Sequence, residues 1–322
     1  MKTYIPSYYS KFKCIADKCT HNCCIGWEIG IDPDTFEKYK LFDSKLGTTL
    51  LENIEESGDG VTFRFGENKR CANLDGNNLC KIISAHGEDA LCDICREHPR
   101  FRNYFDGREE LGLGLSCEEA ARIILSNPDK VTMEFIEEDT SITSSDVSVE
   151  ATALLSERDA LIAALQDRSL SVSERIEQVL TSFDTDIFPT ELDFWCDVLL
   201  GLERLDESWT DILSTLKNSG IKNLKDVSLS ENELAAEQLL VYFVTRHLQF
   251  NDNEPDDSEQ FNVSDVFKFA ILSCYVIFAA ANLIRNSFDN FFDALCEAAR
   301  LYSSEIEYST DNTDELLFEV SF

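Results

Sequence analysis

Four cysteines fall within eleven residues in the segment CIADKCTHNCC at 14–24, and a second dense group ends in CDICREHPR at 92–100. Nine of the twelve cysteines of this 322-residue chain lie between positions 14 and 117. They are Cys14, Cys19, Cys23, Cys24, Cys71, Cys80, Cys92, Cys95 and Cys117. So many thiols in one region indicate a disulfide framework, a bound metal or thiol chemistry, and each choice restricts how this region folds.

A disulfide framework fits the chain poorly. A chain of this length can bury a large core and does not depend on bridges to fold. The first residues, MKTYIPSYYSKFKC, contain no apolar run typical of a secretion signal, so we expect a reducing, cytoplasmic location. The adjacent Cys23 and Cys24 would also need separate partners, because neighbouring side chains point in different directions.

Metal binding explains the nine thiols better, because thiolates are soft ligands that hold zinc or iron–sulfur clusters. Cys92 and Cys95 have the C-x₂-C spacing typical of structural zinc, whereas the irregular gaps at 14–24 suit a cluster beneath a loop or two sites. Position 26 is Gly, so Cys19 and Cys23 do not continue into the C-x₃-C-x₂-C motif of radical enzymes. We expect His21 to lie near the ligands rather than to be one.

The remaining cysteines are predicted to be core residues. Cys196, Cys274 and Cys296 occur singly among apolar residues in helical patterns, which is the usual setting of a buried thiol. Cys274 lies in an apolar segment, 266–284, that approaches the length of a membrane span but carries Lys268 near its start. We therefore expect a buried central helix and no membrane association.

The pattern of the whole chain predicts a mostly α fold of two domains. Residues 1–136 are predicted to form a cysteine-rich metal-binding module with a small β-hairpin, and residues 148–322 an acidic α-helical domain, joined by the polar segment 137–150. In the first domain we expect a helix over 32–54, a strand at 61–65, a hairpin around Asp75-Gly76 and helices ending before Pro99 and Pro128. In the second we expect helices over 148–166, 171–183, 190–204, 207–218, 231–250, 263–285 and 287–303.

The charge of −33 is concentrated in the second half of the chain. Residues 1–125 contain 16 Lys and Arg against 21 Asp and Glu, whereas residues 126–322 contain 12 against 40. Such a chain lacks the basic face that binding to nucleic acid requires. An acidic surface suits a basic or lysine-bearing partner, although solubility alone also accounts for it.

Four stretches together resemble one known family. The run ending in Cys23-Cys24, then CANLDGNNLCKI, LCDICREHPR and LSCEEAARIIL, is similar to a cysteine-rich family of zinc- or iron-chelating proteins, and within it to the flagellin lysine N-methylase group. The resemblance is dense over about residues 4–126 and continues without distinct motifs into the helical half. Arg96 and Arg100 match arginines that flank the last cysteine pair, whereas His98 stands where an aromatic residue is more usual.

The resemblance implies an enzyme that moves a methyl group from S-adenosylmethionine to lysine side chains of flagellin or another lysine-bearing protein. It also implies a [4Fe-4S] cluster held by the nine cysteines, with zinc as the alternative metal. A non-catalytic zinc- or iron-binding interaction module and an iron–sulfur electron-transfer protein are the competing hypotheses. No catalytic base is identified, and the candidates are Tyr4, Tyr8, Tyr9, Asp17, Glu28 and Asp93.

Overall fold

The chain folds into two compact units in a computed structural model that describes residues 1–26, 28–42, 45–58, 60–138, 147–183, 190–250 and 261–321. The thiol unit comprises Lys13–Arg100 and Cys117–Glu119. The helical unit comprises Met1–Phe12, Phe101–Ser116 and Ala120–Phe322. This division differs from the predicted boundary near residue 136, because the first strand of the chain pairs with strands that follow the cysteine-rich region. Most of the predicted linker, residues 139–146, lies outside the described residues.

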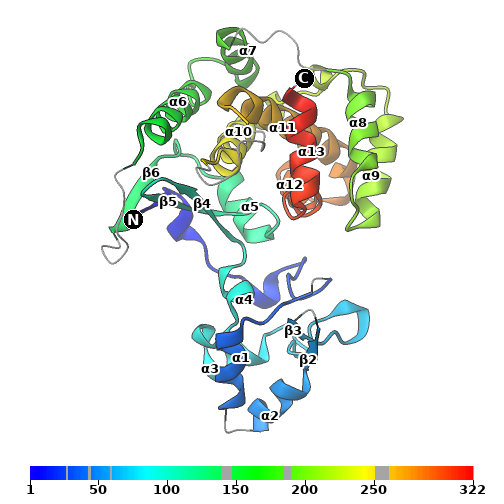
Figure 1. Cartoon of the computed structure of the whole chain (residues 1–322). Coiled ribbons are helices and arrows are strands. Elements are labelled where there is room, and N and C mark those ends of the chain that lie inside the picture. Colours follow the sequence, from blue (N-terminus) through cyan, green and yellow to red (C-terminus); the bar gives the residue numbers. More distant parts are fainter. Residues whose placement is uncertain are drawn as a thin grey trace. The chain divides into compact units, whose positions relative to one another are not determined.

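The thiol unit is built from short elements. Its one described hairpin joins β2 and β3 in antiparallel register, with Ile54 opposite Phe63, which confirms a strand near 61–65. At Asp75 the predicted hairpin is reduced to a turn, in which the Asp75 carboxylate accepts from the amide of Leu79 and a single bridge joins Leu74 to Cys80. The elements are α1 (Pro33–Lys40), α2 (Lys45–Glu52), β2 (Ile54–Ser57), β3 (Gly60–Phe63), α3 (Lys81–His86) and α4 (Asp93–Glu97) (Figure 1).

The single helix predicted over 32–54 is two helices. Asp32 caps α1, since its carboxylate accepts from the amide of Thr35 at 2.8 Å and Pro33 occupies the first turn. The chain leaves the helix at Leu41 before α2 begins at Lys45. The cap was thus readable from the sequence, but the break was not.

A four-stranded sheet in the helical unit was not predicted. Its order is β4-β5-β1-β6, with β1 parallel to β5 and antiparallel to β6. Gly112 lies against the ring of Phe101, and a Cβ atom at this position would come within 2.1 Å of that ring. The strands are β1 (Lys2–Pro6), β4 (Arg100–Phe105), β5 (Arg108–Leu113) and β6 (Met133–Glu138).

Helices make up most of the helical unit, and seven of them confirm the helices predicted beyond residue 147 to within a few residues at each end. The last helix, α13, was not predicted. The helices are α5 (Glu118–Leu125), α6 (Val149–Leu165), α7 (Val172–Ser182), α8 (Leu192–Gly201), α9 (Glu207–Lys217), α10 (Glu233–His247), α11 (Val263–Ile284), α12 (Phe291–Ile306) and α13 (Thr310–Ser321) (Figure 1). The mostly helical fold class is therefore confirmed.

The centre of the helical unit is α11, which packs against α10, α12 and α13. The segment Val263–Ser287 is long and apolar enough to cross a membrane, but 83% of its most apolar window is buried inside the structure. The one lysine within it, Lys268, lies 3.8 Å from Asp265, one helical turn away. Cys274 is fully buried in this helix, and Cys196 and Cys296 are buried in α8 and α12, as predicted.

Candidate functional site

All nine cysteines of the N-terminal region belong to the thiol unit, and each carries a free thiol. Five of them lie in or against the hydrophobic cluster of that unit. Cys71 and Cys92 are buried within the cluster, and the other three are partly buried against it. We call these five, which are Cys24, Cys71, Cys80, Cys92 and Cys95, the inner thiol group.

The backbone brings the inner thiols together from three segments. The amide of Cys71 donates to the carbonyl of Cys24 at 2.8 Å. Cys80 precedes the first residue of α3, and Cys92 precedes the first residue of α4. Because α4 begins at once after Cys92, the C-x₂-C spacing places Cys92 and Cys95 in one helical turn, and their thiols form a hydrogen bond.

Hydrogen bonds between neighbouring thiols give the two members of a pair different pKa values. The hydrogen bond from Cys95 lowers the pKa of Cys92, and the same bond raises the pKa of Cys95. Likewise, the hydrogen bond between Cys23 and Cys24 lowers the pKa of Cys23 and raises that of Cys24. Burial raises the pKa of Cys71 and of Cys80. In each pair one thiol is therefore disposed to become a thiolate while its neighbour keeps its proton.

A second set of thiols lies outside the hydrophobic cluster, and we call Cys14, Cys19, Cys23 and Cys117 the outer thiol group. Burial is the main cause that raises the pKa of Cys14, and the charges of Cys23 and Cys117 raise it further. Cys23 also makes a side-chain hydrogen bond with His98. The outer group therefore combines residues from both ends of the cysteine-rich region.

A carboxylate that the sequence did not single out holds part of this group. Oε2 of Glu118 accepts from the amide of Thr20 at 2.8 Å and from the amide of His21 at 3.3 Å. It also accepts from the hydroxyl of Thr20 and, at 3.6 Å, from the thiol of Cys19. Burial alone would raise the pKa of Glu118, but the hydrogen bonds from Thr20 and His21 outweigh it and lower the pKa. The local sequence around residue 118 gives no sign of this contact, because its partners lie almost one hundred positions away.

The nine thiols do not form a finished coordination shell. Within the described part of the chain, no three His, Cys, Asp or Glu side chains converge closely enough to hold a metal ion. The donor type nonetheless suits a soft metal, and a bound cation would stabilise the thiolates that burial now disfavours. The assignment of all nine cysteines as metal ligands therefore stays a prediction.

The residues considered as a catalytic base are divided between the two units. Tyr4, Tyr8 and Tyr9 belong to the helical unit, where Tyr8 is buried and burial raises its pKa. Asp17, Glu28 and Asp93 belong to the thiol unit, and Asp93 pairs with Arg96. A buried phenol with a raised pKa is a poor proton acceptor at neutral pH, which disfavours Tyr8.

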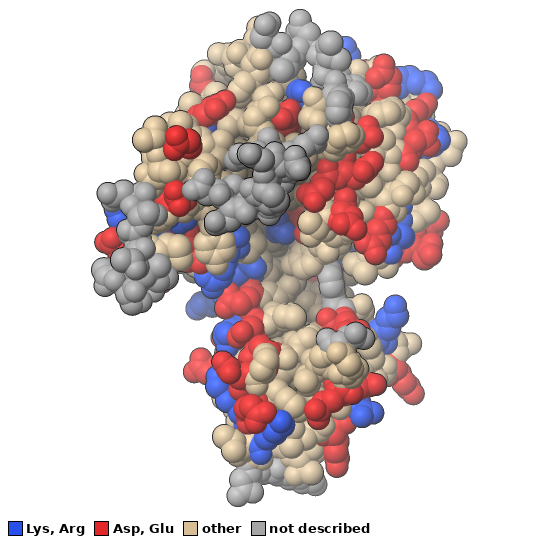
Figure 2. All heavy atoms as spheres, viewed as in Figure 1, with Lys and Arg blue, Asp and Glu red and all other residues tan. Residues whose placement is uncertain are grey.

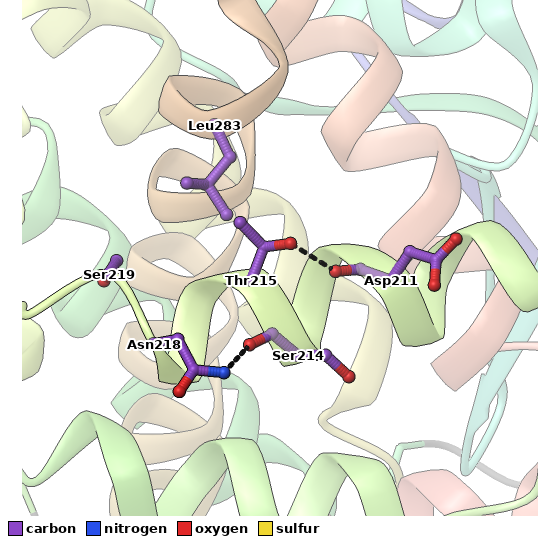
Figure 3. A pocket seen from close by; sticks show the side chains of 6 residues that line it. All are labelled: Asp211, Ser214, Thr215, Asn218, Ser219 and Leu283. Atoms are coloured by element: carbon purple, nitrogen blue, oxygen red, sulfur yellow. Dashed lines mark hydrogen bonds between the residues drawn. The ribbon is translucent and has the colours of Figure 1, made fainter.

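Two surface hollows contain none of the nine thiols. One, of about 510 Å³, lies in the helical unit and is lined by α9 and Leu283. Two of its polar side chains bond to the helix backbone, since Thr215 donates to the carbonyl of Asp211 and Asn218 to that of Ser214 (Figure 3). The other, of about 250 Å³, lies in the thiol unit, and the rings of Phe42 and His86, which stack at 4.2 Å, are part of its lining.

The fold and the site define a mostly helical protein with a separate thiol-rich unit. Comparison with known proteins confirms the resemblance seen in the cysteine motifs. The chain is 29% identical over 135 residues to the flagellar biosynthetic protein FliU of Salmonella muenchen, a match that covers 40% of this chain and 79% of that protein. It is 27% identical over 134 residues to the lysine-N-methylases of Salmonella typhimurium and Salmonella choleraesuis.

The extent of these matches differs between the relatives. The alignment with each lysine-N-methylase covers 40% of this chain and 33% of the relative, so the chain matches about a third of their length. No family model matches the chain, and no solved structure matches it. The similarity therefore applies to a segment of the methylases.

Proposed function

We propose that this protein methylates lysine side chains of flagellin or a related flagellar protein. The observation that carries the proposal is the similarity to two lysine-N-methylases and to a flagellar biosynthetic protein, in a chain that gathers nine thiols into one unit. The names of the relatives suggest the lysine substrate and the flagellar context, and the cysteine motifs point to the same group of proteins.

Methyl transfer to lysine sets a clear chemical requirement. The nucleophile is the neutral amine, whereas a free lysine has a pKa of about 10.4 and is protonated at neutral pH. A site must therefore dehydrate the ammonium group or supply a proton acceptor. Carboxylates can attract the lysine and accept its proton, and they gather on the surface of the helical unit around α8 and α9 (Figure 2).

We further propose S-adenosylmethionine as the methyl donor and a [4Fe-4S] cluster, or alternatively zinc, as the metal group held by the cysteines. When bound, the donor would supply a methyl group carried on a positively charged sulfur: the lysine amine would attack the methyl carbon, and S-adenosylhomocysteine would leave as the carbon–sulfur bond breaks. The segment GLGLSC at 112–117 does not form a dinucleotide-type phosphate loop, because it ends β5 in a mixed sheet and lacks the third glycine. The nine cysteines of the thiol unit, five of which lie together against one hydrophobic cluster, would hold the metal group.

Metal analysis tests this proposal first. The full chain is purified without oxygen, and its iron, acid-labile sulfide and zinc are measured together with its visible absorption. We expect a coloured protein that contains about four iron and four sulfide per protein chain. Stoichiometric zinc in a colourless protein would contradict the cluster and favour a metal-binding interaction module.

Binding and turnover tests separate the remaining hypotheses. Calorimetry with S-adenosylmethionine is expected to show binding, and mass spectrometry of flagellin incubated with both is expected to show added methyl groups on lysine. A reversible redox couple without binding of the methyl donor would instead support electron transfer. Replacement of Cys23 and Cys24 by Ser is expected to abolish methylation while circular dichroism shows a retained fold, whereas collapse of the fold would favour a structural metal.

A further inference from the structure

Glu118 joins two cysteine segments that lie almost one hundred positions apart in the sequence. Cys117 precedes it directly, and its carboxylate accepts hydrogen bonds from Cys19, Thr20 and His21. Four donors converge on one oxygen atom, Oε2, and two of them are backbone amides. A carboxylate is suited to this position because it accepts several hydrogen bonds at once and carries the charge that strengthens them.

Besides the bonds to Glu118, the segment reaches distant residues at its end, where Asn22 donates to the carbonyl of Asn78 at 3.5 Å and Cys23 bonds with His98. Among the described residues, no member of 13–23 belongs to the hydrophobic cluster of the thiol unit. Around Ala16 the backbone hydrogen bonds are those of a single turn, from Lys18 to Ile15 and from Cys19 to Ala16. A short exposed segment without packed apolar side chains loses its order easily, so long-range hydrogen bonds decide its position.

We propose that Glu118 is a positioning residue that holds Cys117 beside the Cys19–His21 segment and so assembles the outer thiol group. Without its carboxylate, Cys14 and Cys19 would stand on a loosely held loop, and Cys117 would stand apart from them. The role of this group in metal binding rests on the proposed function. The positioning itself is a property of the protein with or without metal.

Hydrogen exchange of the full chain, prepared free of metal, measures the positioning directly. Glu118→Ala removes the acceptor and is expected to speed exchange of the Thr20 and His21 amides at least tenfold, with exchange in α1 unchanged. Alkylation of Cys19 is expected to speed up in parallel. Glu118→Gln retains an acceptor oxygen and is expected to restore part of the protection, a rescue that general loosening of the unit would not give.

Glu119→Ala is the matched control, because Glu119 is the next residue of the same helical turn, is also half-buried and carries the same charge. We expect its exchange and alkylation rates to equal those of the parent protein. If Glu118→Ala does not fold by circular dichroism, Thr20→Val removes the hydroxyl donor from the other side and is expected to speed exchange at His21. Unchanged exchange in the Glu118 variants, or an equal change in Glu119→Ala, would overturn the proposal.

A second measurement links the positioning to metal content. In protein reconstituted with iron and sulfide, Glu118→Ala is expected to hold at most half the metal of the parent, and Glu119→Ala the same amount as the parent. If the parent itself takes up no metal, the proposed function fails while the exchange result still decides the positioning role. Full metal content in Glu118→Ala, together with fast exchange, would overturn the link between this positioning and metal binding.

Discussion

The guanidinium of Arg158 in α6 donates two hydrogen bonds to the carboxylate of Glu110 in β5, at 2.6 and 3.0 Å. Both side chains are almost completely buried, with 0% and 2% exposed. Arg108 lies 2.6 Å from the same carboxylate, and Glu110 raises the pKa of Arg158 against the effect of burial. The pair fixes a helix to the sheet through charge in a place where apolar packing would normally do so.

Removal of the acidic partner is expected to cost far more than the pair itself contributes. Glu110→Ala would leave the buried guanidinium of Arg158 without its main partner, so we expect the free energy of unfolding to fall by about 3–5 kcal/mol. Urea denaturation followed by circular dichroism measures the loss. Glu231→Ala is the control, because Glu231 pairs with Arg285 at the surface and should cost no more than about 1 kcal/mol. Equal losses in the two variants would contradict the argument.

The buried His247 predicts a pH dependence of stability. Nε2 of His247 lies 2.8 Å from Glu307, which also accepts from Tyr242 and Arg246, and Asp314 acts on the ring as well. Burial lowers the pKa of His247 below 6.5, although Glu307 opposes this shift. Below pH 6.5 the unfolded chain therefore binds a proton that the folded chain does not, so acid favours unfolding.

We expect this residue to reduce the free energy of unfolding by up to about 1.4 kcal/mol per pH unit as the pH falls from 6.5 toward the folded pKa. His247→Gln keeps a donor near Glu307 but cannot titrate, so the difference between parent and variant isolates the effect. Urea denaturation at steps from pH 8 to pH 5 measures both. Parallel curves for the two proteins would show that His247 does not titrate differently on folding.

Local sequence patterns predicted the helices well, because the signals that form a helix lie within the helix and at its ends. The apolar run at 266–284 becomes α11 because a helix that is apolar on all sides must be buried. Ser171 and Glu174 form the capping box that starts α7. The sheet escaped prediction because β1 pairs with β5 more than one hundred residues away, and no local periodicity records such a partner.

The candidate site was predictable in kind but not in arrangement. The sequence identified nine thiols as one functional set, and they do share one unit. Their division into inner and outer groups depends on which of them the hydrophobic cluster covers, and spacing does not reveal this. The role of Glu118 depends on hydrogen bonds that it accepts from Thr20 and His21, almost one hundred positions away, and no local pattern reveals such partners.

The packing of α11 predicts how much a buried aromatic side chain contributes to the free energy of unfolding. Phe278 is fully buried, whereas Phe318 in α13 is 39% exposed. Phe278→Ala is expected to lower the free energy of unfolding by about 3–5 kcal/mol, because it removes buried apolar surface and leaves a cavity. The same change at Phe318 should cost about 1 kcal/mol or less, since little buried volume is lost. Chemical denaturation of both variants tests the difference, and a small effect at Phe278 would show that the core collapses to fill the space.

The contrast between the two classes of cysteine gives a prediction on metal content. Cys92 is fully buried at the start of α4 beside Cys95, whereas Cys274 is fully buried among apolar side chains of α11. Ser fits either space but is a far weaker ligand for a soft metal than a thiolate. Cys92→Ser is therefore expected to lose most of the bound iron or zinc, and Cys274→Ser none of it.

Elemental analysis of both variants, reconstituted in parallel with iron and sulfide and with zinc, measures this difference. The thermal midpoint of the thiol unit should also fall in Cys92→Ser, because metal binding to the folded state contributes to its stability. A chelator added to the parent protein is expected to lower that midpoint in the same direction, and to leave Cys92→Ser nearly unchanged. Metal contents that are equal in the two variants would remove Cys92 from the set of metal ligands.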